Sequence, residues 1–169
     1  GSLLHLLACS LTGYALSRRE LPGRKAYITF MLVTILFSGG LIPGYVAISS
    51  MGLINTFWVM VIPGMFSAFD VLIFKQFFED IPQEMEEAAI VDGATEIKLF
   101  FKIIFPLSKP VMAAIGLFTV VGHWNAWFDA FLYIGQQHSE LWPLQTYVMI
   151  VFNNLNNLTN PELVKLMQE

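Results

Sequence analysis

Three polar residues lie inside otherwise apolar stretches, where an ionisable side chain is costly and often has a function. Asp70 is the only acid in residues 56–74, while Asn125 and Asp129 are interleaved with aromatic residues. A spacing of four residues puts Asn125 and Asp129 on one face of a helix. For each residue two interpretations stay open, namely a position on a translocation route or a position near a membrane interface. For Asp70 the interfacial interpretation includes a contact with Lys75, about one helical turn away.

Patterns that bind cofactors or perform catalysis are missing from the sequence. There is no Gly-x-x-x-x-Gly-Lys-Ser or Thr loop, so the chain is not expected to bind ATP itself. Gly-x-Ser-x-Gly, His-Glu-x-x-His and Cys-x-x-Cys are also absent. His5, His123 and His138 are isolated, with His5 expected to be a packed or interfacial residue, and Cys9 is the only cysteine. We therefore expect no enzyme activity, no cofactor and no metal site.

The most charged and helix-prone stretch, residues 82–106, predicts a helical hairpin. Pro82 suits a first helical turn, because the amide that proline lacks has no partner there. The glutamates that follow it favour the positive end of the helix dipole. Gly93 after Asp92 indicates a left-handed residue that ends this helix. Thr95 can then cap a second helix.

The second helix of this hairpin is predicted to be amphipathic. Its apolar residues recur at helical spacing and are expected on one face, at Ile97, Phe100, Phe101 and Ile104. Pro106 and Pro110 restrict the residues before them and remove backbone donors, so they are expected to end the helix. The pattern is thus helix, tight turn, helix and proline stop.

The composition indicates an integral membrane protein. Apolar residues make up 56% of the 169 residues and charged residues 13%. Lysine and arginine fall in two clusters, the first at Arg18, Arg19, Arg24 and Lys25 and the second at Lys75, Lys98, Lys102 and Lys109. Long uncharged stretches separate these clusters, which is typical of membrane proteins. We expect membrane crossings at residues 2–17, 27–37, 56–74 and 111–134, the first of them short for a full span.

The sidedness of these crossings follows from the basic clusters. Positive residues face the cytoplasm in most membrane proteins, so residues 18–25 and 82–106 are both expected there. An anionic-lipid contact is an alternative for residues 18–25 and places them on the same side. Within residues 56–74, Pro63 is expected to produce a kink. The net charge of −4 comes without a basic face, so no nucleic-acid partner is expected.

The hairpin resembles the signature of the membrane-spanning subunits of bacterial ATP-binding-cassette importers. The family pattern is Glu-Ala-Ala, three residues, Gly, nine residues, Ile, one residue, and Leu-Pro. It is found here as Glu87-Ala88-Ala89, Gly93, Ile103 and Phe105-Pro106, with Phe105 in place of leucine. In the family, the two short helices form a cytoplasmic coupling element that docks on the ATPase subunit.

The resemblance implies an ATPase-coupling role for the matching residues, which are Glu87, Ala88, Ala89, Asp92, Gly93, Ile103 and Pro106. Glu87 is expected to make a polar contact, while the two alanines leave room for close helix approach. Gly93 allows the turn. For Asp92 a cap or ion pair near the turn and a solvated acid are both open.

Further stretches, at residues 15–19, 37–43 and 122–128, resemble the oligosaccharide and complex-sugar branch of these permeases. The resemblance implies an all-α, polytopic transmembrane helical bundle in the bacterial inner membrane. Residues 1–169 are then one domain, a fragment without the family's first and last helices. The implied partners are an ATPase subunit, a second permease subunit, an extracytoplasmic solute-binding protein, membrane lipid and a sugar-like solute.

Two other classes of protein are alternatives to this transport subunit, and each needs features that the sequence should show. A membrane enzyme with catalytic acids at Asp70 and Asp129 needs a paired base or metal ligand nearby, and the sequence offers none. A secondary transporter driven by an ion gradient is favoured by internal pseudo-symmetry, which is not visible. The permease subunit is therefore the leading hypothesis.

Overall fold

The computed structural model describes residues 1–159 except 83, 86–88, 90 and 92, and every regular element in that part is helical. The elements in chain order are α1 (Ser2–Ser17), α2 (Arg24–Leu36), α3 (Leu41–Ser50), the 3₁₀ turns η1 (Phe57–Met60) and η2 (Pro63–Met65), α4 (Ala68–Glu79), α6 (Glu96–Leu99), the π-helical turn η3 (Phe100–Ile104), α7 (Phe105–Leu107), α8 (Lys109–Trp124), α9 (Trp127–Tyr133), the 3₁₀ segment η4 (Gln136–Leu141) and α10 (Leu144–Thr159). The all-α expectation is confirmed for these residues.

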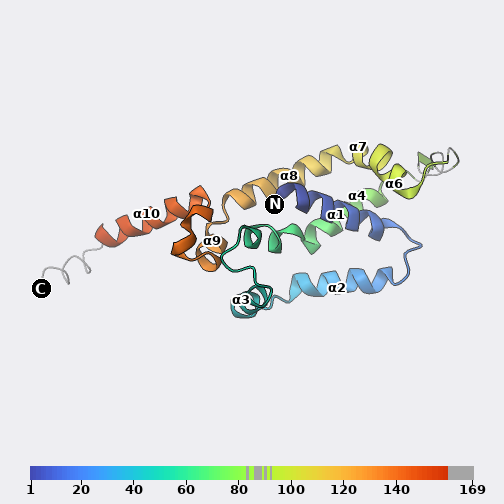
Figure 1. Ribbon diagram of the computed structural model, residues 1–169. Helices are drawn as coiled ribbons and strands as arrows, with labels where there is room; N and C mark the ends of the chain where they lie inside the picture. Colours follow the sequence, from blue (N-terminus) through green and yellow to red (C-terminus); the bar gives the residue numbers. More distant parts are fainter. Residues whose placement is uncertain (83, 86–88, 90, 92, 160–169) are drawn as a thin grey trace, which may run out of the picture.

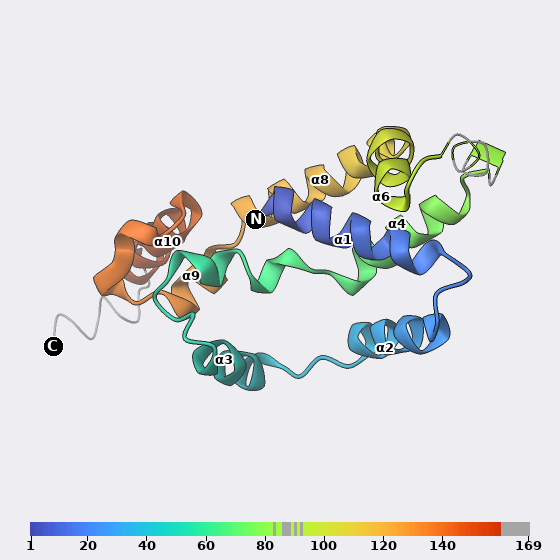
Figure 2. The same cartoon turned by 45° about the vertical axis from the view of Figure 1, so that its right-hand side comes forward.

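The helices form an elongated bundle in which α1 contacts both α4 and α8 (Figure 1). The connection from α1 to α2 and helix α6 lie at one end of the bundle, whereas α3 and α9 lie at the other (Figures 1 and 2). The two basic stretches of the sequence are thus at the same end, as expected for segments that face the same side.

The main core lies where α1 and α4 meet the second arm of the hairpin. Its fully buried side chains include Cys9, Val71, Phe74, Leu99 and Ile104. Large side chains from α4 and from η3 therefore share one apolar cluster, and this cluster attaches the hairpin to the bundle.

No single helix among the described residues is both long and apolar enough to cross a bilayer. Three bent pairs of helices meet those criteria of length and composition together. They are Arg24–Leu36 with Leu41–Ser50, bent by 119°, Phe57–Met65 with Ala68–Glu79, bent by 45°, and Glu96–Leu107 with Lys109–Trp124, bent by 76°.

The predicted kink at Pro63 is a complete break in the helix. Two 3₁₀ turns precede Ala68, where α4 begins. Pro63 opens the second of these turns, where its missing N–H costs no helical hydrogen bond. Ser67 then caps α4, because its Oγ accepts a hydrogen bond from the Asp70 N–H at 3.2 Å.

The predicted proline stop is wrong in its details. Pro106 lies inside α7, and Pro110 lies in the first turn of α8. In the π-helical turn η3, the Phe105 N–H bonds to Phe100 O, so the hydrogen-bond ladder has already shifted before Pro106. Pro110 begins a helix, where the lost amide has no partner. The chain changes direction at Ser108, between α7 and α8.

The crossing of α1 and α4 depends on Gly13. A Cβ at this position would lie 2.6 Å from Phe74 Cβ and 3.0 Å from the backbone nitrogen of Lys75. We predict that Gly13→Ala lowers the free energy of unfolding by about 1–3 kcal/mol, because the helices must separate to admit the methyl group. Thermal unfolding of the purified full-length protein in detergent measures this change.

Gly44→Ala is the matched control, since Gly44 lies within α3 and a Cβ there meets nothing within 4 Å. Alanine favours a helix interior over glycine by up to about 1 kcal/mol, so this variant should be as stable as the parent or more so. Equal unfolding temperatures for the two variants would contradict the close crossing.

Candidate functional site

The turn of the predicted coupling hairpin has the geometry of a Schellman cap. Gly93 has a left-handed backbone with φ 78°, and the Ala94 N–H donates to Ala89 O at 3.0 Å. The predicted left-handed glycine is therefore confirmed. Ala89 is buried at this turn. Glu87, Ala88 and Asp92 lie outside the described residues, so their roles stay predictions.

The second arm begins as predicted, because Thr95 Oγ1 accepts a hydrogen bond from the Lys98 N–H at 3.4 Å. The predicted apolar face is wrong in part. Phe100 and Ile104 are buried, whereas Ile97 is 72% exposed and Phe101 49% exposed.

The buried face of the arm begins later than predicted, at Leu99, and continues through the π-helical turn Phe100–Ile104 to Ile104. Phe100 packs on Tyr14 and Phe78, with ring centroids 4.9 and 6.3 Å away. Ile97 and Phe101 are left on the outer face of the arm.

The two other signature positions of this arm differ in burial. Ile103 is half-buried and packs against the main core, while Pro106 is exposed. Ile103 thus anchors the arm, and Pro106 follows the π-helical turn that the arm contains.

Asp70 pairs with a histidine from the start of α1. His5 Nε2 lies 2.9 Å from Asp70 Oδ2, and His5 Nδ1 donates to Gly64 O at 2.9 Å. The expected contact with Lys75 is not formed, since Lys75 Nζ donates to Glu79 Oε2 at 2.7 Å. His5 is buried, as expected, and connects α1, the break at η2 and the first turn of α4.

A cavity of about 250 Å³ lies between the break before α4 and the junction of α8 with α9. Its lining residues are Ile48, Val59, Met60, Pro63, Gly64, Gly122, His123, Ala126, Asp129 and Tyr133. Among the described residues, His123 Nε2 is buried without a hydrogen-bond partner, while its Nδ1 donates to Thr119 O at 2.9 Å. The cavity thus combines apolar walls with an imidazole, a carboxylate and a phenol.

Of the three predicted route residues, only Asp129 lines this cavity. The prediction that Asn125 and Asp129 share one helical face is wrong, because α8 ends at Trp124 and α9 begins at Trp127. Asn125 lies in the break, where its N–H donates to Val121 O at 3.0 Å. Asp70 does not line the cavity, although His5 links it to Gly64, which does.

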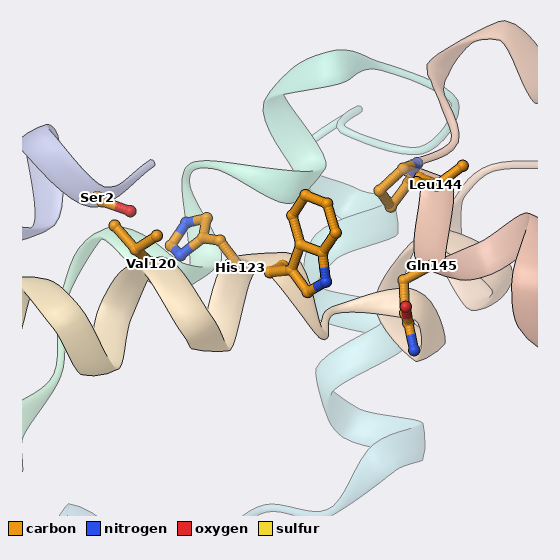
Figure 3. Close-up of a pocket in the computed structure, with 7 residues that line it drawn as sticks. Ser2, Val120, His123, Leu144 and Gln145 are labelled. Carbon is orange, nitrogen blue, oxygen red and sulfur yellow. The ribbon is translucent and has the colours of Figure 1, made fainter.

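A second cavity of about 320 Å³ lies beside the first and shares His123 with it. Figure 3 shows Val120 and His123 reaching from α8 toward Ser2, with Leu144 and Gln145 on α10 across from them. Trp124 and Pro143 complete its lining. His123 therefore lines both cavities. It lies in the last turn of α8, the end of that helix that points away from α6 (Figure 1).

Sequence reasoning missed His123, Tyr133 and Gly64 as neighbours in one cavity. In the sequence His123 is an isolated histidine, because no ligand-like spacing surrounds it. The usable signals were the Pro63-Gly64 break and the glycine, histidine and tryptophan at residues 122–124. No local rule brings these distant segments together.

Residues 21–157 match the model of the family described as binding-protein-dependent transport system inner membrane component. The chain belongs to this family. The chain is also similar in structure to a chain in the crystal structure of a bacterial ABC transporter involved in the import of the acidic polysaccharide alginate. The TM-score is 0.86 at 28% identity, and the match covers 98% of this chain and 58% of that chain. The fold is thus that of an importer permease.

Two proteins of Bacillus subtilis are among the similar sequences. The polygalacturonan/rhamnogalacturonan transport system permease protein YtcP is 41% identical over 86% of this chain and 50% of its own length. Protein LplC is 41% identical over 86% of this chain and 48% of its own length. The arabinooligosaccharides transport system permease protein AraQ of Halalkalibacterium halodurans is 31% identical over 73% of this chain and 45% of its own length. The chain therefore spans about half the length of these relatives.

The pairing of Asp70 with His5 predicts a measurable loss of stability. Asp70→Ala removes the carboxylate that pairs with Nε2 of a buried imidazole, which costs about 1–3 kcal/mol. Asp80→Ala is the control at the C-cap of the same helix. Asp80 is exposed, and its side chain accepts a hydrogen bond from Gln76 at 3.2 Å on the surface. It should change stability by no more than about 0.5 kcal/mol. Denaturant unfolding of the full-length protein that shows equal losses would contradict this role of Asp70.

Proposed function

We propose that this chain is a permease subunit of a binding-protein-dependent ATP-binding-cassette importer, and that it takes up sugars or oligosaccharides. The observation that carries the proposal is the left-handed Gly93 with its Ala94–Ala89 hydrogen bond, which is the turn that a coupling hairpin at the signature segment needs. The family supports the same function, since its members are inner membrane components of binding-protein-dependent transport systems.

The substrate class rests on the relatives. Their names include a polygalacturonan and rhamnogalacturonan permease and an arabinooligosaccharide permease, and the solved structure belongs to an alginate importer. The cavity beside His123, Asp129 and Tyr133 supports this class, because sugar hydroxyls bond to such polar groups and sugar rings pack on apolar walls. We place this cavity on the translocation route.

The partners follow from the importer assignment. An ATPase subunit docks on residues 82–106, a second permease subunit completes the route, and an extracytoplasmic binding protein delivers the solute. The outer face of the second arm supports the docking, because Ile97 and Phe101 are large apolar side chains exposed there. ATP hydrolysis belongs to the ATPase subunit, and this chain is a multi-pass protein of the bacterial inner membrane.

Gly93 provides the direct test of this function. A Cβ there meets no atom of the described residues within 4 Å, so the cost of Gly93→Val is taken as the strain of a branched residue at φ 78°. We predict that this strain reorients the second arm, so that the full-length complex loses solute-stimulated ATP hydrolysis although the subunit still inserts into the membrane. Hydrolysis by the reconstituted complex, with and without solute, is the measurement.

Gly52→Val is the matched control, since Gly52 has φ 70° and equally open surroundings but lies at the opposite end of the bundle (Figure 1). It carries a similar local strain without altering the hairpin and should keep most of the stimulation. Normal stimulation in Gly93→Val, or equal loss in both variants, would refute the coupling role.

A further inference from the structure

The connection between α1 and α2 makes ionic contacts that its sequence did not predict. Arg24 forms an ion pair with Glu79, the last residue of α4, and its Nε donates to Leu16 O at 2.7 Å. Lys75 completes the group through its 2.7 Å bond to Glu79. The side chains of Arg24, Glu79 and Lys75 are only 23%, 22% and 16% exposed. Partly buried charges of this kind interact more strongly than surface pairs.

A second arginine of this region, Arg18, contacts the second arm of the hairpin at Glu96. Arg18 Nη2 lies 3.4 Å from Glu96 Oε2, and the Tyr14 hydroxyl donates to the same oxygen at 3.2 Å. Arg18 also bonds to the Tyr14 hydroxyl and stacks over its ring, 4.5 Å from the centroid. Glu96 is the first residue of α6. Its side chain is 67% exposed, and its carboxylate contacts Arg18 and Tyr14 at the end of α1.

Glu79 ends the helix that precedes the hairpin, and Glu96 begins the second arm of the hairpin. The connection between α1 and α2, which contacts both glutamates, has a regular turn structure of its own. The Leu21 N–H bonds to Arg18 O at 3.4 Å, the Arg24 N–H bonds to Leu21 O at 3.2 Å, and the Leu21 side chain packs against the main core. A short turn with an anchored apolar residue can thus hold two charges at fixed positions.

We propose that residues 18–24 act as a clamp on the coupling hairpin, with Arg18 and Arg24 as positioning residues. The clamp rests on the proposed function, because it matters for transport only if the hairpin couples the ATPase to the bundle. When Glu79 and Glu96 are both held by this connection, motion of the hairpin moves α1, α4 and α6 together as one packed body. Without the clamp, the hairpin pivots on its apolar contacts and part of the motion is lost.

The basic cluster offers an internal comparison. If its charges served only membrane orientation or lipid binding, then Arg18, Arg19, Arg24 and Lys25 would be nearly equivalent. The clamp instead distinguishes Arg18 and Arg24 from Arg19 and Lys25, whose side chains are exposed. Arg19→Glu is therefore the matched control for Arg18→Glu, because both change the same net charge one residue apart.

The experiment uses the full-length protein, assembled with its ATPase, partner permease and binding protein in liposomes. The readout is the number of solute molecules taken up per ATP hydrolysed. We expect Arg18→Glu to lower this ratio by at least about twofold, the lower end of the coupling energies seen between contacting residues. Arg19→Glu should leave the ratio unchanged. The exchange Arg18→Glu with Glu96→Arg should restore at least half of the loss, because it re-forms the ion pair with its charges reversed. A smaller amount of folded complex would lower uptake and hydrolysis together and leave their ratio unchanged.

Two results overturn the clamp: an equal loss in Arg19→Glu, or an exchange variant no better than Arg18→Glu alone. If the Arg18→Glu variant fails to insert into the membrane, the ratio of uptake to hydrolysis is compared between Arg18→Gln and Arg19→Gln instead, and the same two results overturn the clamp. Gly93→Val in the same assay separates this inference from the proposed function. If Gly93→Val uncouples and the arginine variants do not, the clamp alone fails. If Gly93→Val stays coupled, the coupling function itself fails.

Discussion

The close packing of α1 on α4 is the interaction on which the rest of the structure depends. Gly13 allows the two helices to meet with no room for a side chain. Polar contacts secure the same pair at both ends. His5 of α1 pairs with Asp70 of α4 at one end, and at the other end Arg24 of α2 bonds to Leu16 O of α1 and pairs with Glu79 of α4. Buried polar pairs add geometric definition to an apolar contact, because one helix cannot slide along the other without breaking them.

Both regions to which we assign a function, the cavity and the hairpin, are attached to this helix pair. The cavity is tied to it through Gly64, whose carbonyl oxygen accepts the His5 hydrogen bond. The hairpin is tied to it through Phe100, which packs on Tyr14 and Phe78. Helix α8 runs from the end of the hairpin to His123 and forms a second connection. An element packed this tightly moves as a unit, so displacement of the hairpin can reach the cavity as a rigid-body motion.

Several features could be predicted from the sequence because they are local. The left-handed Gly93, the Thr95 cap and the break at Pro63 each depend on residues within one or two turns. The failures involve contacts between distant residues or changes of helical register. Asp70 pairs with His5 rather than with the nearby Lys75, and no spacing rule relates residues so far apart. Asn125 and Asp129 do not share a helical face, because α8 ends at Trp124 and α9 begins at Trp127. Ile97 is exposed although its spacing from Phe100 looks regular in the sequence.

The most direct test of the account is the sidedness of the hairpin and its contact with the ATPase. In full-length protein in which every native cysteine, including Cys9, is replaced by serine, a single cysteine at the exposed position Ile97 is treated with a membrane-impermeant thiol reagent. The account predicts no labelling in intact cells, labelling in inverted membrane vesicles, and protection when the ATPase subunit is bound. A cysteine at Ser139 should show the opposite sidedness. Labelling of the Ile97 cysteine from outside intact cells, or unchanged labelling in the presence of the ATPase, would contradict the account.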